Sequence, residues 1–143
     1  MTLGQDVAAA LPELRLAAES MMVDTCRVRR LDPDMPSVPD PDTLALVPNY
    51  LSGSVYVGAC RVQRSGALSP QESPVGGYEF GLGTILAQLP LSATGILRDD
   101  VLEVTAVAAI SDPDLVGVVA SVRANLTKTH ATKRTLICEQ VTP

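Results

Sequence analysis

The sequence predicts a mainly β protein: a small, mostly antiparallel β-barrel of six or seven strands, with a short N-terminal α-helix and two long loops. Three observations predict this fold class. Apolar and polar residues alternate in several separate segments, which is the period of a half-buried strand. Pro, Gly and Asp cluster between those segments, as expected for turns. The apolar share is 46%, mostly Ala, Val and Leu, with 3% aromatic residues and no Trp. Such side chains favour strands.

Residues 1–23 are predicted to form a helical segment ahead of a β-barrel domain at 24–143. The run PELRLAAESMM (12–22) contains no β-branched residue, and Pro12 and Glu13 suit the first turn of a helix. The preceding VAAAL could lengthen this helix, in which case Pro12 would kink it. One apolar stripe comprises Leu14, Ala18 and Met21 or Met22. The stripe could pack on the barrel or on another subunit.

Two segments, DTCRVRR (24–30) and SVYVGACRVQR (54–64), share the pattern Cys-Arg-Val-x-Arg. Alternation places Cys26 and Cys60 inward and the arginines outward, so both segments are interpreted as strands of one sheet. Their flanking residues differ, which argues against an internal duplication.

Further strands are expected along the rest of the chain. A strand within 78–91 has a bulge or bend at Gly81 and Gly83. A polar turn at 98–100 leads into LEVTA, and Asp112-Pro113-Asp114 forms a tight turn. The residues predicted to face the core in these later strands are Leu102, Val104, Val116, Val118, Ala120, Val122, Leu136 and Cys138.

Two long loops interrupt the pattern, at 31–52 and 64–77. The first is rich in Pro and Asp, and the second in Ser, Gly and Pro. Long loops in compact domains are usually functional or disordered, so both are candidate interaction segments.

Composition argues against several kinds of function. A net charge of −5 and a pI near 4.7 disfavour a protein that grips nucleic acid. No run is long and apolar enough for a membrane span, and the N-terminus lacks the pattern of a signal peptide. The 3 cysteines are widely spaced and are interpreted as buried thiols, while the single histidine, His130, is interpreted as a surface-loop residue. We therefore expect no catalytic, cofactor or metal site.

Several motifs occur in a specific order along the chain: DTC (24–26), VYVGACRV (55–62), TGI (94–96) with Asp100, DPDLVG (112–117) and, after Arg134, CEQVT (138–142). This order resembles the head-closure or stopper proteins of tailed phages of actinobacteria, which connect head to tail. The resemblance covers nearly the whole chain. The sequence departs from the family pattern in the length of loop 31–52 and in Gln140, where an acidic residue is common.

The resemblance implies a structural virion protein of the neck, assembled in the host cytoplasm and without a membrane partner. It implies a homo-oligomeric ring, six-fold in preference to twelve-fold, that closes the DNA-filled head below the portal and its adaptor. The ring would present a platform to the tail terminator or tail tube. Genomic DNA would pass through an acidic lumen without sequence-specific binding.

Two segments are candidate sites under this hypothesis. The candidate lumen loop comprises Ser65, Gly66, Ala67, Leu68, Ser69, Pro70, Gln71, Glu72 and Ser73. The candidate partner-contact loop comprises Asp32, Asp34, Asp40, Asp42 and Tyr50. An adaptor is also expected to add a strand at an exposed strand edge.

Three alternatives stay open. A tail terminator or another connector component would carry a similar barrel. A small nucleic-acid-binding barrel is disfavoured by the negative charge and the scarcity of aromatic residues. A cysteine-dependent hydrolase would need one of the thiols to be reactive.

Overall fold

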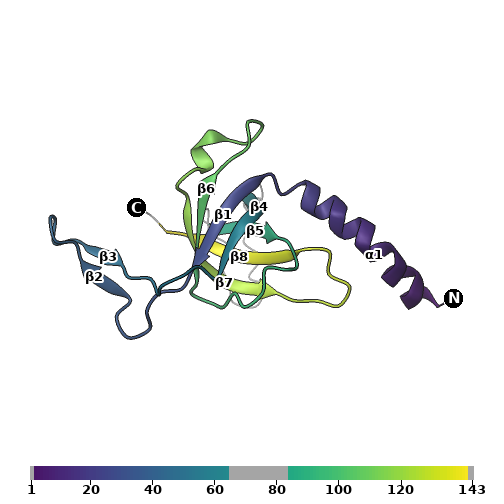
Figure 1. Ribbon diagram of the computed structural model, residues 1–143, viewed down its shortest axis with the longest axis horizontal. Helices are drawn as coiled ribbons and strands as arrows, with labels where there is room; N and C mark the ends of the chain where they lie inside the picture. Colours follow the sequence, from purple (N-terminus) through teal and green to yellow (C-terminus); the bar gives the residue numbers. More distant parts are fainter. Residues whose placement is uncertain (1, 65–83, 142–143) are drawn as a thin grey trace, which may run out of the picture.

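The body of the molecule is a closed barrel of antiparallel strands in the order β1-β4-β5-β8-β7-β6, in which β6 returns to pair with β1 (Figure 1). The computed structural model describes residues 2–64 and 84–141. The barrel strands are β1 (Asp24–Arg29), β4 (Tyr56–Arg64), β5 (Thr84–Leu89), β6 (Val101–Ala106), β7 (Val119–Leu126) and β8 (Arg134–Gln140). The predicted fold class is therefore confirmed. Gly81 and Gly83, where a bulge or bend was predicted, lie outside the described residues.

The barrel interior is filled by small and medium apolar side chains. In β1 the burial alternates residue by residue, with Cys26 and Val28 fully inside. The other strands contribute Cys60, Ile85, Leu89, Leu102, Val104, Ala120, Val122, Leu136 and Cys138 to the same cluster. Burying a side chain such as Val or Leu stabilises the fold by about 1.5–3 kcal/mol. The alternation seen in the sequence thus identified most of the core.

The two Cys-Arg-Val-x-Arg segments are neighbouring antiparallel strands. Asp24 lies opposite Cys60, and Cys26 lies opposite Gly58, so both thiols point into the barrel. Gly58 is required there because the ring of Tyr56 folds back over it. The Tyr56 hydroxyl donates a hydrogen bond to the Ala59 carbonyl at 2.7 Å.

The N-terminal helix, α1 (Leu3–Ser20), begins nine residues before the predicted start at Pro12. Its start is fixed by a capping box, in which the Thr2 side chain accepts a hydrogen bond from the Gln5 amide and the Gln5 side chain accepts one from the Thr2 amide. Pro12 therefore lies inside the helix. Because Pro12 has no amide hydrogen, the helix loses one internal hydrogen bond at this exposed position, and the remaining helical residues outweigh that loss.

Val116 does not face the core as predicted. It follows a short 3₁₀ helix, η1 (Pro113–Leu115), in the connection between β6 and β7, and is 51% exposed. Asp112 caps η1 by accepting a hydrogen bond from the Asp114 amide, which stabilises the turn. The Asp112-Pro113-Asp114 turn is present, but β7 begins only at Val119.

An ion pair between the buried Asp100 and the partly exposed Arg30 closes one end of the barrel. Asp100 is 1% exposed and accepts two hydrogen bonds from the Arg30 guanidinium, at 2.9 and 3.0 Å. Its carboxylate also accepts a hydrogen bond from the Leu97 amide, and Arg30 donates one to the Gly95 carbonyl. The pair thereby fixes the end of β1 against the turn that precedes β6.

A second buried carboxylate, Asp24, lies at the start of β1. It accepts hydrogen bonds from the Ala108 amide at 3.0 Å and the Ser111 hydroxyl at 2.6 Å. These bonds hold the connection that follows β6. Asp24, Gly58 and Asp100 all belong to the motifs singled out in the sequence, and each has a structural role.

We predict that Asp100→Asn lowers the free energy of unfolding by about 2 kcal/mol, because a buried charge pair loses one partner while water still reaches Arg30. The matched control is Asp99→Asn, whose carboxylate is 69% exposed and pairs with Arg123 at 3.4 Å. That change should cost less than about 0.5 kcal/mol. Urea unfolding of both variants checks this, and similar losses in the two would contradict it.

Gly58→Ala should lower the free energy of unfolding by about 1–3 kcal/mol, as expected for overpacking. An added Cβ would lie 2.8 Å from the Tyr56 hydroxyl oxygen. In a Tyr56→Phe background the same substitution should cost less, since the hydroxyl is gone. Equal costs in both backgrounds, measured by thermal or chemical unfolding, would show that the Tyr56 hydroxyl is not the reason for the glycine.

Candidate functional site

The candidate partner-contact loop forms an antiparallel hairpin that projects from the barrel (Figure 1). Its strands are β2 (Ser37–Pro39) and β3 (Leu46–Pro48), with Val38 opposite Val47. Two hydrogen bonds close the connecting turn. The Asp40 amide donates to the Ala45 carbonyl, and the Leu44 amide donates to the Asp40 carbonyl, both at 2.8 Å. Three-residue strands are too short to show a period-two pattern, so the sequence indicated only a loop. We call residues 31–51 the acidic hairpin.

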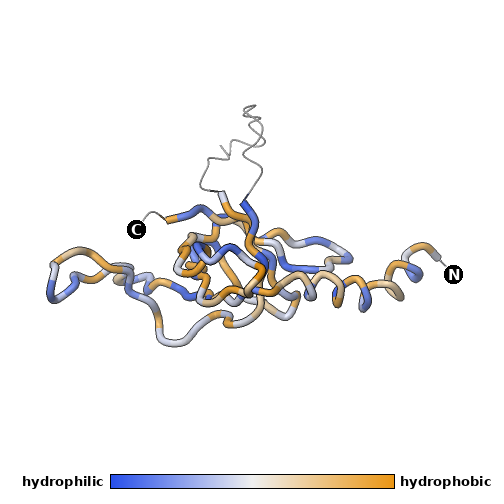
Figure 2. The backbone as a smooth tube through the Cα atoms, turned by 90° about the horizontal axis from the view of Figure 1, so that it is seen from above, coloured by the Kyte–Doolittle hydropathy of each residue, from blue (hydrophilic) through white to orange (hydrophobic). Residues whose placement is uncertain are grey.

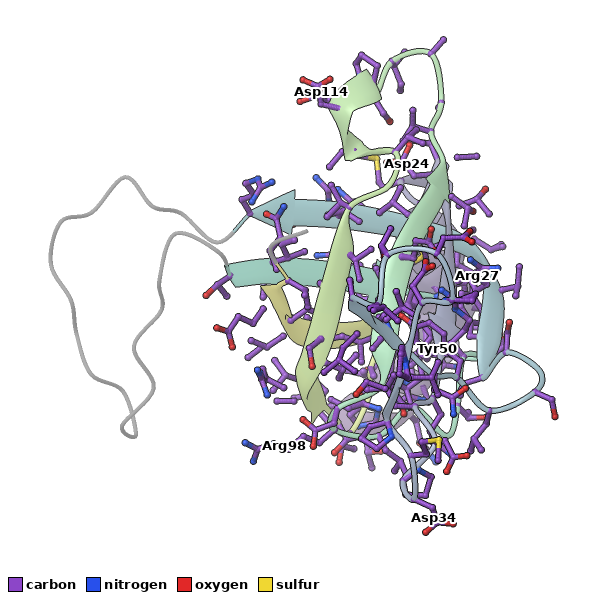
Figure 3. The ribbon with its side chains drawn as sticks, turned by 90° about the vertical axis from the view of Figure 1, so that its left-hand side faces the viewer. Asp24, Arg27, Asp34, Tyr50, Arg98 and Asp114 are labelled. Carbon is purple, nitrogen blue, oxygen red and sulfur yellow. The ribbon has the colours of Figure 1, made fainter. Side chains whose placement is uncertain are left out.

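The acidic hairpin is attached to the barrel through Tyr50. The ring of Tyr50 lies under the Arg29 guanidinium, 3.7 Å from its centroid, and Tyr50 pairs with Leu31 in an isolated β-bridge. Arg29 in turn donates to Glu103 on β6 at 3.2 Å, and Arg27 donates to the same carboxylate at 2.6 Å. Figure 3 shows Tyr50 and Arg27 against the barrel. Tyr50 anchors the hairpin in the structure, and its predicted contact with a partner stays a prediction.

The four predicted aspartates divide into two pairs. Asp32 accepts hydrogen bonds from the amides of Asp34 and Met35, and Asp40 accepts them from the amides of Asp42 and Thr43. These two carboxylates therefore shape the turns. Asp34 and Asp42 are exposed, and Asp34 projects away from the barrel in Figure 3. The exposed pair can face a partner.

The acidic hairpin also exposes large apolar side chains that sequence reasoning missed. Met35 is 56% exposed, Leu44 77% and Leu46 72%. The hairpin contains no Lys or Arg, so these apolar groups lie among acidic ones. Their presence in a segment otherwise rich in Pro and Asp is the signal that would have identified them, since apolar contacts dominate binding at interfaces.

The expectation that a partner adds a strand to an exposed edge is wrong for the barrel, because its strands form a closed ring of pairings. In the acidic hairpin, Pro39 and Pro48 lie within the two strands and Pro36 and Pro41 lie just beside them. Proline has no amide hydrogen to donate to an added strand. Contacts with a partner therefore rely on side chains.

The candidate lumen loop, 65–73, lies outside the described residues. The structure does show where it leaves the barrel. β4 ends at Arg64 and β5 begins at Thr84, and Arg64 lies opposite Ile85. Arg64 also donates to the Gln140 side chain at 2.8 Å.

The three cysteines are free and buried. Burial raises the pKa of Cys138 to about 12, and a hydrogen bond with Cys60, together with burial, raises the pKa of Cys26. A thiol with a raised pKa stays protonated at neutral pH and is a poor nucleophile. His130 is exposed in the β7–β8 connection, so it does not meet the buried Cys138.

Within residues 2–64 and 84–141, no group of at least 3 His, Cys, Asp or Glu side chains could hold a metal ion. No helix in the same ranges is long and apolar enough to cross a membrane.

We predict that Tyr50→Ala loosens the acidic hairpin without unfolding the barrel. The contact with Arg29 is worth about 0.5–1 kcal/mol at an exposed position. Amide hydrogen exchange within residues 31–51 should therefore accelerate several-fold, while exchange in β5 and β8 stays unchanged. Leu44→Ala, in the far turn, is the control and should leave both regions unchanged. Unaltered exchange in the hairpin of Tyr50→Ala would show that the anchor lies elsewhere.

No curated protein matches this chain. The solution structure of a protein from Shigella flexneri 2a is similar, with a TM-score of 0.54 and 16% identity, and the match covers 84% of this chain and 93% of that chain. At this identity the likeness shows the fold alone. Residues 14–139 match the family of unknown function DUF6093. Since this range includes the C-terminal part of α1 and nearly the whole barrel, the chain belongs to the DUF6093 family.

Proposed function

We propose that this protein is a structural virion protein, the head-to-tail stopper of a tailed phage. Copies of the chain form a ring between the portal adaptor and the tail, and the ring closes the DNA-filled head. The order of motifs along the chain supports this proposal. The structure gives a physical reason for several of them, because Asp24 and Asp100 fix connections at the ends of the strands and Gly58 leaves room for the Tyr56 ring.

The observation that carries the proposal is a rigid barrel with two projecting elements. The acidic hairpin and α1 extend from the barrel in opposite directions (Figure 1). Both expose large apolar side chains, such as Leu44 at 77% and Leu16 at 67%. A subunit of a neck ring needs such surfaces, because it contacts its neighbours, the adaptor and the tail at the same time.

The charge distribution also suits a ring that DNA traverses. The chain has a net charge of −5. Like charges repel the phosphate backbone, so DNA would slide past an acidic surface without binding to it. The protein would retain DNA by obstruction.

The test is a phage in which this gene is deleted. We predict that its lysates contain complete tails beside separate heads that lose their DNA. Purified protein added to such a lysate should join heads to tails and restore infectivity by at least tenfold. Electron microscopy and a nuclease-protection assay for packaged DNA measure the two effects.

A tail terminator is the second candidate, since it would carry a similar barrel. Its loss would leave filled, closed heads and tails of abnormal length. That outcome would replace the stopper proposal. Normal, infectious particles in the absence of the gene would reject both candidates.

A further inference from the structure

One face of the acidic hairpin is apolar and exposed. Side chains at alternate positions of a strand point to the same face, and Pro39 lies opposite Leu46 in the pairing of β2 with β3. Pro39, Leu46 and Pro48 therefore share one face. All three are exposed, Leu46 at 72%. Figure 2 shows hydrophobic stretches beside hydrophilic ones along this projecting hairpin. An apolar face that the barrel leaves uncovered is a surface for binding another molecule.

Leu44, in the turn between β2 and β3, adds another exposed apolar group. Its backbone φ is 59°, in the left-handed region that glycine adopts more easily than leucine. Its side chain is 77% exposed, so burial within the molecule does not compensate for the backbone strain. A glycine would suit this turn better. The leucine side chain is thus not needed for folding, and it is available for a partner.

Hydrogen bonds and prolines hold the acidic hairpin in one conformation. The Asn49 side chain donates to the Met35 carbonyl at 2.9 Å, and the Asn49 carbonyl accepts a hydrogen bond from the Asp32 amide, also at 2.9 Å. These bonds join the two arms near the base, and the Asp40 turn joins them at the tip. Prolines in and beside the strands restrict the backbone further. A surface that is ordered before binding loses less conformational entropy when a partner binds.

The charge of the acidic hairpin indicates what kind of partner it fits. Residues 31–51 contain four aspartates and no Lys or Arg. These aspartates account for −4 of the net charge of −5, which leaves −1 for the rest of the chain. A second copy therefore offers no positive excess outside its own hairpin, and its Arg27 and Arg29 already pair with Glu103. Nucleic acid would be repelled. The surface that complements the hairpin is a basic surface on a different protein.

We propose that the acidic hairpin binds a different protein by inserting Leu44 and Leu46 into an apolar pocket that Lys and Arg side chains surround. The apolar groups provide most of the affinity, as residues at the centre of an interface usually do. The exposed Asp34 and Asp42 meet the basic rim and determine the orientation of binding. This inference rests on the proposed function for the identity of the partner, a neighbouring protein of the neck, but the contact itself can be tested without a phage particle.

A photo-cross-linking amino acid at position 44 identifies the partner. The full chain, with p-benzoylphenylalanine in place of Leu44, is irradiated in the cells that naturally produce it, and mass spectrometry maps the cross-linked residues. Position 110 is the control, because Ile110 is 87% exposed and lies in the connection after β6. We expect about fivefold more product from position 44, with one protein other than this chain, at an apolar site beside Lys or Arg. Product between two copies, a site without basic neighbours, or equal yields from both positions would overturn the contact.

Charge reversal tests the basic rim on the captured protein. The purified Asp34→Lys/Asp42→Lys chain should bind that protein about tenfold more weakly than the unmodified chain does, measured by isothermal titration calorimetry. Changing the nearest Lys or Arg residues of the partner to Glu should restore binding of this variant. Glu13→Lys/Asp114→Lys is the matched control, since it makes the same change in charge at exposed residues of α1 and η1. Equal losses in the two variants, or no rescue, would contradict the basic rim.

Leu44→Gly separates binding from folding. Because glycine suits a φ of 59°, the melting temperature should stay the same or rise. Affinity for the captured protein should nevertheless fall by about tenfold or more, because the apolar group that enters the pocket is gone. Undiminished affinity of Leu44→Gly would show that Leu44 is not inserted.

The contact and the proposed function can fail separately. A captured protein that belongs to the neck or tail, bound at such a pocket, supports both. A captured protein from outside the particle, bound at an apolar site with a basic rim, would reject the stopper function and keep the contact. Unjoined heads and tails after deletion of the gene, together with no selective cross-linking from position 44, would keep the stopper function and reject the contact.

Discussion

Closure of the barrel through the pairing of β1 with β6 is the constraint on which the rest of the structure depends. β1 pairs with β4 on one side and with β6 on the other, so the six barrel strands that lie within residues 2–64 and 84–141 form a ring without a free edge. A narrow closed barrel is filled by its own small and medium side chains. Cys26, Val28 and Ala120 meet that requirement, which gives a physical reason for a sequence rich in Ala and Val and poor in aromatic residues. The buried carboxylates of Asp24 and Asp100 then fix the connections at the ends of the strands.

A barrel without edges must bind its partners through side chains or through elements that project from it. The acidic hairpin and α1 are such elements, and each is held to the barrel in a defined way. Arg29 links Tyr50 to Glu103, and Arg15 links α1 to Ala131. In the proposed ring the barrel would act as the rigid body, and these two elements would make the contacts that determine assembly. Prolines in and beside β2 and β3 would keep the hairpin from pairing nonspecifically with other strands.

Features that depend on neighbouring residues, such as which strand residues face inward, could be predicted from the sequence. Contacts between residues far apart in the chain could not. The inward direction of Cys26, Cys60 and Leu136 follows from local alternation, and all three are buried. Asp100 stood in a polar turn, and its burial depends on Arg30, seventy positions earlier. The acidic segment was recognised as a candidate site, and two of its aspartates are exposed. The contact of Tyr50 with Arg29 leaves no local pattern in the sequence, so its anchoring role was not predicted. The exposed Leu44 and Leu46 were missed although they stand out as large apolar residues in a segment rich in Pro and Asp.

The central claim is that this protein is a subunit of the neck, and cryo-electron microscopy of intact particles of the phage that encodes it tests this most directly. The account predicts a ring of these barrels between the portal adaptor and the tail. Neck density that is fully explained by other chains, with this protein absent from the particle, would contradict the account.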